Sequence, residues 1–186
     1  IGQGEVKTPG DYCDVLVAMN PAALMANAKW AKPGASIILD LDAFDEKSMQ
    51  KAGFKTMDPI AELKLEDYNI IWSPITTLTK ESLKDSGLDQ KAIVRSKNMF
   101  TLGMCYFMFS RPLHFTEKYL EKKFAKKPDL IAPNKKVLND GYNYASNVHA
   151  IGNTYRIEPA EQAPGVYRNI NGNQATAWGL LAASEK

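Results

Sequence analysis

The sequence predicts an α/β protein with a three-layer architecture, in which helices flank a largely parallel sheet of about four or five strands. Two short and almost continuous apolar runs, residues 14–19 and 36–40, are typical of strands that are covered on both faces. An alanine-rich segment lies between them, and two parallel strands joined by a helix make a βαβ unit. Strand-like segments come early in the chain and helical ones late.

The first helix is predicted over residues 22–31. Asn20 caps helices well and Pro21 fits a first helical turn, so the two residues together favour a helix start. The turn residues 32–34 are expected to end this helix before the second strand. Three more elements complete the predicted sheet region: a helix over 44–52, an edge strand over 54–57 and a strand over 68–72.

The middle of the chain is predicted to be helical. A short amphipathic helix should follow Ser73 and Pro74. The further helices are expected over 90–109, over 116–126 with Thr116 as its cap, and over 129–148, where Pro133 bends or restarts the chain.

The sequence changes character after Val148, where glycine and proline interrupt a polar stretch without a clear period. We therefore expect a main domain over residues 1–150 and a linker over 151–165. The start of a second domain is expected over 166–186. It comprises a strand over 166–170, a turn, and a small-residue helix over 174–183 capped by Asn173.

Composition excludes several classes of protein. Hydrophobic residues make up 45% of the 186 residues and charged residues 24%, which is typical of globular chains and not of disordered or coiled-coil ones. A net charge of +2 predicts neither a nucleic-acid nor a membrane partner. The longest apolar run, Met99–Phe109, is shorter than the ~20 residues of a membrane helix.

Cysteine and histidine are too sparse for a recognisable metal or disulfide pattern. Cys13 and Cys105 lie far apart, so they form no CxxC motif and no disulfide framework, which favours a reducing, cytoplasmic location. His114 and His149 have no carboxylate or cysteine at ligand spacing. No metal site is therefore predicted.

Three groups of charged residues could carry function. Lys97 begins the most apolar helix, where burial would drive its ammonium towards an anionic partner; the alternative is a lysine whose charged end stays in water. Asp40, Asp42 and Asp45 could hold a hard cation, although caps of the following helix are more common. Five lysines (118, 122, 123, 126 and 127) form a solvated helix face or, alternatively, dock an acidic electron carrier.

Several segments, in the same order, resemble the gamma-type domain of 2-oxoacid:ferredoxin oxidoreductases, the pyruvate/ketoisovalerate oxidoreductase gamma family. They are Pro9–Asn20, the Lys32–Gly34 turn with its following strand, Lys97–Met99 with Leu102–Gly103, and Asn134–Tyr142. The closing segment Gly172–Ala183 is similar to the first helix of the pyrimidine-binding domain, which follows the gamma domain in fused alpha subunits of the 2-oxoglutarate type.

The resemblance implies a part of an enzyme that oxidatively decarboxylates 2-oxoglutarate to succinyl-CoA. The full enzyme would use thiamine diphosphate, Mg, an iron-sulfur cluster and coenzyme A, whereas this part is expected to bind no cofactor and to be inactive alone. The implied partners are the beta subunit, the remainder of the alpha chain and, through the full complex, ferredoxin. The family's first strand with its glycine loop, and its thiamine-activating glutamate, are expected to lie before Ile1 and after Lys186.

The site residues implied by the resemblance are Lys97 as the catalytic residue, and Asn98 and Asn173 as cofactor-binding residues. Two other functions remain open. The chain could be a non-catalytic module that holds subunits together, or an α/β domain that binds coenzyme A or a nucleotide at its strand ends.

Overall fold

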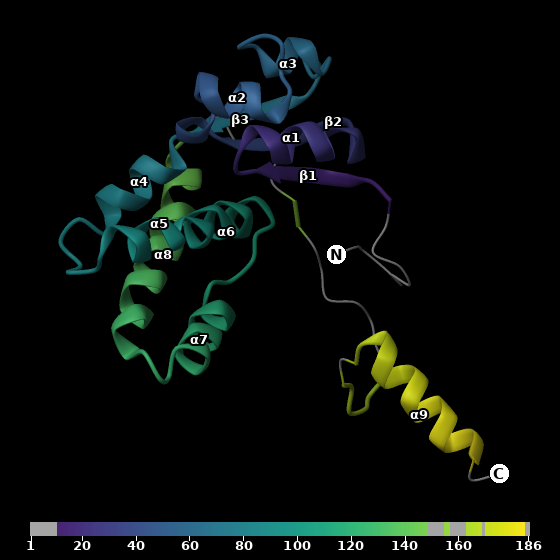
Figure 1. Cartoon of the computed structure of the whole chain (residues 1–186). Helices are drawn as coiled ribbons and strands as arrows, with labels where there is room; N and C mark the ends of the chain where they lie inside the picture. Colours follow the sequence, from purple (N-terminus) through teal and green to yellow (C-terminus); the bar gives the residue numbers. More distant parts are fainter. Residues whose placement is uncertain (1–10, 149–154, 157–162, 169, 185–186) are drawn as a thin grey trace.

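The computed structural model describes residues 11–148, 155–156, 163–168 and 170–184. Its centre is a parallel sheet with the strand order β1-β2-β3 (Figure 1). The strands are β1 (Cys13–Ala18), β2 (Ala31–Asp40) and β3 (Asn69–Ser73). Val17 of β1 pairs with Ile38 of β2, which pairs with Ile71 of β3. The predicted α/β class is confirmed.

One face of the sheet is covered by the helices that connect its strands. These helices are α1 (Pro21–Asn27), α2 (Glu46–Ala52) and α3 (Pro59–Glu62), with short 3-10 helices at Ala28–Trp30 and Leu41–Ala43. Ile37 and Leu39 point to this face and pack with Leu24 of α1 and Met49 of α2. Because neighbouring residues of a strand point to opposite faces, Ile38 must lie in the other layer.

The opposite face carries a larger helical layer (Figure 1). Its helices are α4 (Ile75–Ser82), α5 (Gln90–Arg95), α6 (Lys97–Met108), α7 (His114–Lys123) and α8 (Ile131–Asn147), with a 3-10 helix at Pro128–Leu130 before α8. Ile38 and Ile71 pack with Phe100, Met104 and Val137 of this layer. The sheet is therefore buried on both faces, which explains why its strands are continuously apolar.

Helices α6 and α8 approach each other closely at two glycines. A Cβ atom on Gly103 would overlap the carbonyl oxygen of Leu138, and a Cβ on Gly141 would overlap that of Phe100. The two backbones are therefore in direct contact, and a residue with a side chain at either position would push the helices apart.

Strand β2 begins earlier than the sequence predicts. The expected turn residues 32–34 lie within the strand, and the predicted helix 22–31 ends as α1 at Asn27. Cys13 pairs with Ala31 but Val15 pairs with Ser36, so β2 bulges between these pairs, and Gly34 takes φ +73° there. A bulge accommodates the glycine and proline that read as a turn in the sequence.

The predicted edge strand over 54–57 is wrong. These residues form a turn before α3, and Phe54 is buried under α2. The carboxylate of Glu62 accepts the backbone N–H groups of Lys55 (2.9 Å) and Thr56 (3.0 Å). A side chain thus satisfies the donors that a neighbouring strand would otherwise bind.

The predicted helix over 90–109 is two helices, α5 and α6. They meet at the buried Ser96, whose Oγ donates to the carbonyl of Ala92. Such a bond back to the preceding turn bends helices. Thr116 is not a cap either, because α7 begins at His114 and the Thr116 hydroxyl bonds instead to that of Tyr106 (2.6 Å). Pro133 lies in the first turn of α8, where no N–H is needed.

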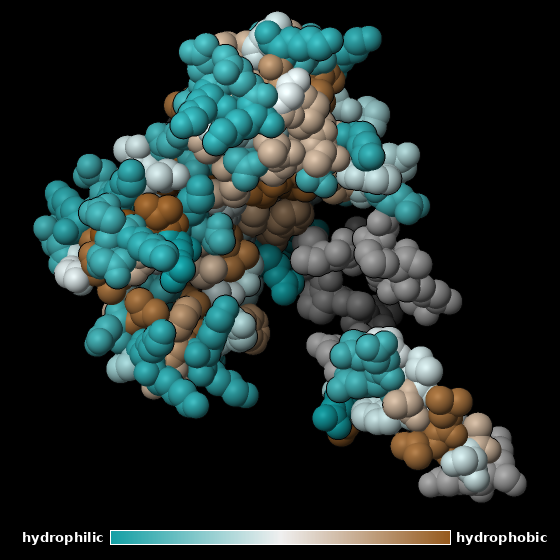
Figure 2. All heavy atoms as spheres, in the orientation of Figure 1, coloured by the Kyte–Doolittle hydropathy of each residue, from teal (hydrophilic) through white to brown (hydrophobic). Residues whose placement is uncertain are grey.

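The last described element is α9 (Gly172–Ser184), which Figure 1 shows apart from the layered body. Its cap is Asn171 rather than Asn173, because Asn171 Oδ1 accepts from the N–H of Gln174 (2.9 Å). None of its residues is buried, and an apolar patch is visible on it in Figure 2. The predicted strand over 166–170 is not formed in its described residues, 166–168 and 170.

The predicted linker lies mostly outside the described residues, so the predicted domain boundaries remain predictions. Within the part of the chain that the structure describes, no helix has the length and apolar character needed to cross a membrane.

Candidate functional site

The carboxyl ends of the three strands lie at one edge of the sheet, where two of them contact α6. Met19 directly follows β1, Asp40 ends β2 and Ser73 ends β3, and Asp40 and Ser73 are partners in the register. The hydroxyl of Thr101 on α6 donates to Met19 Sδ (3.3 Å). This edge is where open α/β sheets commonly bind ligands.

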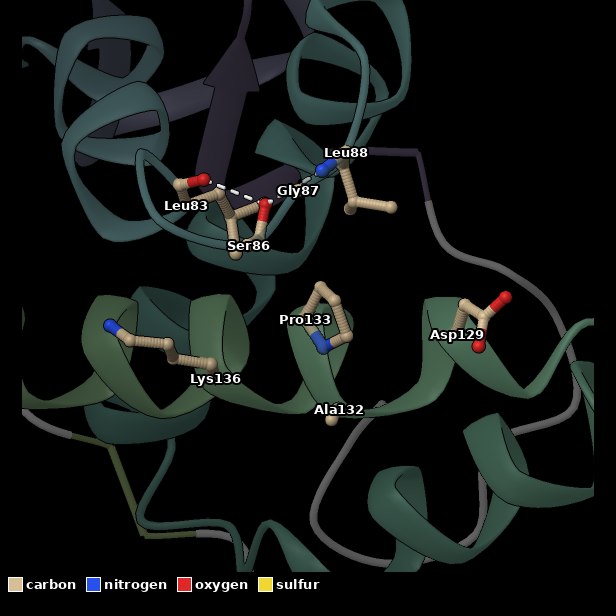
Figure 3. A pocket seen from close by; sticks show the side chains of 8 residues that line it. All are labelled: Leu83, Ser86, Gly87, Leu88, Asp129, Ala132, Pro133 and Lys136. Atoms are coloured by element: carbon tan, nitrogen blue, oxygen red, sulfur yellow. Dashed lines mark hydrogen bonds between the residues drawn. The ribbon is translucent and has the colours of Figure 1, made fainter.

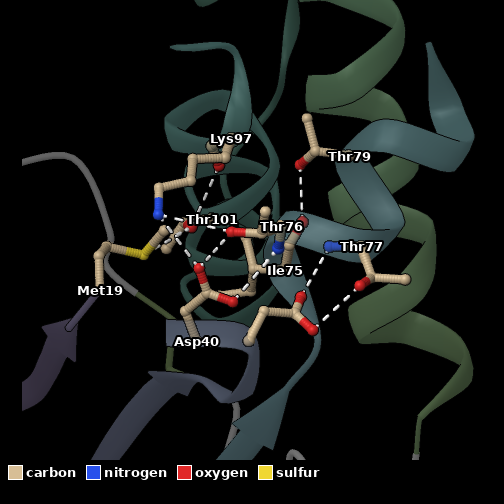
Figure 4. A network of polar contacts seen from close by, with 9 residues as sticks. Met19, Asp40, Ile75, Thr76, Thr77, Thr79, Lys97 and Thr101 are labelled. Atoms are coloured by element: carbon tan, nitrogen blue, oxygen red, sulfur yellow. Dashed lines mark hydrogen bonds and ion pairs between the residues drawn. The ribbon is translucent and has the colours of Figure 1, made fainter. Parts of the chain in front are cut away.

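Asp40 is the anchor of the site (Figure 4). Its carboxylate is completely buried and accepts three hydrogen bonds from two helices. The N–H and hydroxyl of Thr76 on α4 donate to it at 3.2 and 2.7 Å, and Lys97 Nζ on α6 donates at 3.2 Å. A buried carboxylate needs such donors, since an unpaired charge in the interior is costly.

Lys97 is thereby held at the first turn of α6 with its ammonium turned to the sheet edge. Its Nζ also lies 3.5 Å from Thr76 Oγ1, and its side chain is 23% exposed. Asp40 is the anionic partner that a partly buried lysine requires. The two residues are 57 positions apart in the sequence, and each holds the side chain of the other in place. An ammonium has three N–H donors, so Lys97 can also donate to an incoming carboxylate or phosphate.

Ser73 contributes a group that sequence reasoning missed. Its residue is 1% exposed, and its Oγ is the one buried side-chain polar atom without a hydrogen bond among the described residues. Ser73 is the register partner of Asp40 on the neighbouring strand, so the two residues lie side by side at the end of the sheet. Nothing in an isolated Ser-Pro dipeptide marks it, because its burial depends on α4 and on the neighbouring strand.

Of the three aspartates at the end of β2 and beyond it, only Asp45 caps the following helix, as favoured above, whereas the other two bind a distant helix. Asp45 caps the following helix α2 through the N–H of Ser48, and that bond together with the Ser48 hydroxyl lowers the pKa of Asp45. Asp40 and Asp42 instead cap α4, where Asp42 Oδ2 accepts from the N–H of Thr77 (2.7 Å).

The structure separates the predicted site residues. Asn98 is exposed next to Lys97 in sequence, but it lines a cavity of about 360 Å³ between α6, α7 and α8, away from Asp40. Asn173 is exposed in the first turn of α9. Lys97 alone of the three belongs to the network at the sheet edge, within the contacts that the described residues make.

A second hollow, an open groove of about 670 Å³, lies between the α4–α5 loop and the start of α8 (Figure 3). Leu83 and Leu88 lie on one side of it and Pro133 on the other. The hydroxyl of Ser86 is bound within the loop, because it donates to the Leu83 carbonyl and accepts from the N–H of Leu88. The Ser86 hydroxyl is therefore already bound and is not free to orient a ligand in the groove.

The cysteines do not fit an iron-sulfur cluster. Cys13 lies on β1 and Cys105 on α6, and burial raises the pKa of the Cys105 thiol to about 11. Cluster ligands are thiolates, usually four of them. Across the residues that are described, no three His, Cys, Asp or Glu side chains gather into a metal-binding group.

Comparison with known proteins identifies the family. Residues 1–144 match the family described as pyruvate ferredoxin/flavodoxin oxidoreductase. The chain belongs to this family. It is also 40% identical over 185 residues to the 2-oxoglutarate oxidoreductase subunit KorA of Mycobacterium tuberculosis. That match covers 100% of this chain and 28% of the KorA subunit, so the chain spans about a quarter of its curated relative.

A solved structure confirms the fold. The 2-oxoglutarate:ferredoxin oxidoreductase of Magnetococcus marinus, solved with 2-oxoglutarate, coenzyme A and succinyl-CoA bound, superposes with a TM-score of 0.57. The match covers 83% of this chain and 23% of that one, at 21% identity. The resemblance inferred from the sequence motifs is therefore confirmed at the level of family and fold.

Proposed function

We propose that this chain supplies the gamma-type domain in the alpha subunit of a thiamine diphosphate-dependent 2-oxoglutarate:ferredoxin oxidoreductase. The intact enzyme would convert 2-oxoglutarate to succinyl-CoA by oxidative decarboxylation. The observation that carries this proposal is 40% identity to a 2-oxoglutarate oxidoreductase subunit along the whole chain. The likeness to a solved enzyme with the matching substrate and product bound supports it.

The proposal includes the cofactors of the intact enzyme: thiamine diphosphate, Mg²⁺, an iron-sulfur cluster and coenzyme A. Thiamine diphosphate supplies the carbanion chemistry of decarboxylation. The cysteines described above do not suit a cluster, so the electron-transfer groups belong to other parts of the enzyme. The implied partners are the beta subunit, the rest of the alpha chain and ferredoxin. A cytoplasmic location belongs to the same proposal.

Within this function we assign Lys97 to the substrate or cofactor side of the domain. Its ammonium is held by Asp40 and Thr76 at the carboxyl edge of the sheet, and its side chain is partly exposed. From there it can bind and orient an anionic group, and Coulomb attraction in a partly desolvated site strengthens that contact. Asn98 and Asn173 remain proposed cofactor contacts, each on a different surface from Lys97.

The function is tested with the intact enzyme by measuring reduction of methyl viologen under anaerobic conditions. We expect reduction that requires both 2-oxoglutarate and coenzyme A, with succinyl-CoA as the product identified by mass spectrometry. Pyruvate and 2-oxoisovalerate serve as matched substrates. Faster turnover of either one would contradict the proposed substrate, and no turnover with any 2-oxoacid would contradict the proposed reaction.

The role of Lys97 is tested with two variants that differ in the charge left behind. Lys97→Met leaves Asp40 unpaired, whereas Lys97→Met combined with Asp40→Asn removes both charges. If Lys97 binds an anionic group, the double variant assembles normally but loses about tenfold or more in kcat/KM for 2-oxoglutarate or coenzyme A. Full activity in the double variant would make Lys97 a purely structural residue.

An assembly role is the second candidate, and α9 is the observation that favours it. The helix has no charged residue from Gly172 to Ser184, and Trp178, Leu180 and Leu181 are all exposed. Apolar helices of this kind are normally covered. Leu180→Asp with Leu181→Asp should then reduce the mass of the purified complex in light scattering, whereas Ala175→Asp, on another side of the same helix, should not. An unchanged mass in both would exclude this role.

A further inference from the structure

The charged residues that line the cavity between α6, α7 and α8 are all positive within the described part of the chain. The larger part, about 360 Å³, is lined by Arg95 and Lys123 together with polar and apolar side chains. A smaller part of about 280 Å³ adds Lys127, and the two parts share Arg95, Phe124 and Asn134. No aspartate or glutamate is among the described residues that line either part.

The acidic residues of α7 are turned away from this cavity and used elsewhere. Glu121 pairs with Lys135 of α8 (2.5 Å), and Glu117 accepts from Asn139 of α8 (2.9 Å). Within the described part of the chain, no ion pair is formed by Arg95, Lys123 or Lys127. The packing of α7 against α8 therefore directs the glutamates of α7 to α8, whereas Lys123 lines the cavity.

The walls of the cavity are fixed by bonds between the helices. The hydroxyls of Tyr106 and Thr116 join α6 to α7, and the two contacts of Glu117 and Glu121 join α7 to α8. A cavity whose walls are held in this way needs little ordering when a ligand enters, which favours binding.

The lining also offers apolar and aromatic surface and a buried amide. Lys123 Nζ lies 5.5 Å from the ring centroid of Tyr119 and 5.7 Å from that of Phe124, so the ammonium is placed against two rings. Met99 provides apolar surface. Asn134 is 8% exposed and uses one amide hydrogen on the Leu130 carbonyl (2.7 Å), with no other hydrogen bond among described residues.

We propose that this cavity is a binding site for a small organic anion, a carboxylate or phosphate carried on an aromatic or short aliphatic body. Arg95 and Lys123 bind the anionic group, Asn134 donates its free amide hydrogen, and Met99, Tyr119 and Phe124 contact the apolar body. The cavity volume lies within the range of small-molecule sites. The site is separate from Lys97 and Asp40, and Asn98, which is proposed above as a cofactor contact, also lines it.

The test is a titration of the intact protein with phenyl phosphate, followed by NMR of ¹³C-labelled methionine methyl groups. Met99→Leu assigns the reporting signal, and Met49, buried on the other face of the sheet, is the internal control. We expect phenyl phosphate to shift the Met99 methyl and leave the Met49 methyl in place. Inorganic phosphate and benzyl alcohol, which each carry half of the ligand's chemistry, should bind more weakly.

Two variants decide whether the cavity or the general surface charge is responsible. Arg95→Gln combined with Lys123→Gln should weaken phenyl phosphate binding about tenfold or more. Lys118→Gln, an exposed change on α7 outside both parts of the cavity, should leave it unchanged. The proposal is overturned if the Met99 methyl does not shift, if the double variant binds as well as the parent, or if Lys118→Gln weakens binding equally.

Discussion

The two halves of the layered body are held together in different ways. In the half with the sheet, residues 11–73, strands pair through backbone bonds and short helices are fixed by side-chain caps such as Asn20, Asp45 and Asp58. In the helical half, residues 75–148, α6 and α8 touch backbone to backbone at Gly103 and Gly141. Replacing one capping residue removes the hydrogen bonds at one helix end, whereas adding a side chain at Gly103 or Gly141 forces two helices apart.

This difference predicts that the largest effect of a single methyl group falls in the helical half. Gly141→Ala places a Cβ on the backbone of Phe100, so α6 and α8 must separate and expose the shared core. We expect a loss of about 3 kcal/mol or more in the free energy of unfolding, measured by urea denaturation. Gly179→Ala in α9, where a Cβ meets open space, is the matched control and should not lower stability. Equal effects would contradict the backbone contact.

The ion pair of Lys97 and Asp40, which links the helical half to the sheet half, should show the next largest effect on the free energy of unfolding. Lys97→Met leaves the buried Asp40 carboxylate without its counter-charge, and we expect a loss of about 2 to 3 kcal/mol, moderated by the partial exposure of Lys97. Adding Asp40→Asn should recover most of it. Lys136→Met, which breaks the exposed pair with Asp140, should cost less than about 1 kcal/mol. If Lys97→Met costs no more stability than Lys136→Met, the anchoring role of Asp40 is refuted.

A smaller and pH-dependent effect is expected in the sheet half at Glu62. Burial by itself raises the pKa of this carboxyl, but the N–H groups of Thr56 and Lys55 outweigh it and hold the pKa below its usual 4.5. Since the folded-state pKa is the lower one, the contribution is present above 4.5 and is lost as the pH falls through the folded-state value.

Glu62→Gln should therefore lower the Tm at neutral pH and make little difference in acid, because protonation has by then removed the parent's advantage. Thermal melts of both proteins from about pH 7 down to about pH 3 measure this difference. A gap in Tm that widens in acid would mean that the carboxylate does not hold the 54–58 turn.

The smallest expected effect is a difference in the rate of chemical labelling between one cysteine of each half, Cys13 and Cys105. Burial raises the pKa of Cys105 to about 11, so at pH 8 almost no thiolate is present to react. We expect iodoacetamide to modify Cys105 in urea but not in the native protein. Cys13, which is partly exposed at the start of β1, should react faster in the native protein, as read by peptide mass spectrometry. Rapid native labelling of Cys105 would show that α6 opens.

Much of the fold could be predicted from local signals. Asn20 and Pro21 start α1, the apolar runs become β1, β2 and β3, and Pro133 falls in a first helical turn. Two of the wrong predictions share one cause. Local composition predicts an edge strand over 54–57 and a turn over 32–34, whereas Glu62 and the bulge against β1 decide the conformations of these segments.

The candidate site divides in the same way. Lys97 could be found from its place at the head of an apolar helix, and its need for an anionic partner follows from burial. The identity of that partner, the distant capping by Asp42 and the orphaned hydroxyl of Ser73 could not, because each depends on segments that meet after folding. Asn98 and Lys97 are neighbours in sequence but contact different parts of the protein, and this also depends on how the helices pack.

The sequence by itself determined the α/β class, most helices and strands, and the family, because local backbone preferences, apolar periodicity and short motifs are written in consecutive residues. The tertiary structure decided which charges meet, where α7 turns its glutamates and its lysines, and why two helices need glycine. Those outcomes depend on side chains from distant segments competing for the same buried space, and no window of neighbouring residues contains that information.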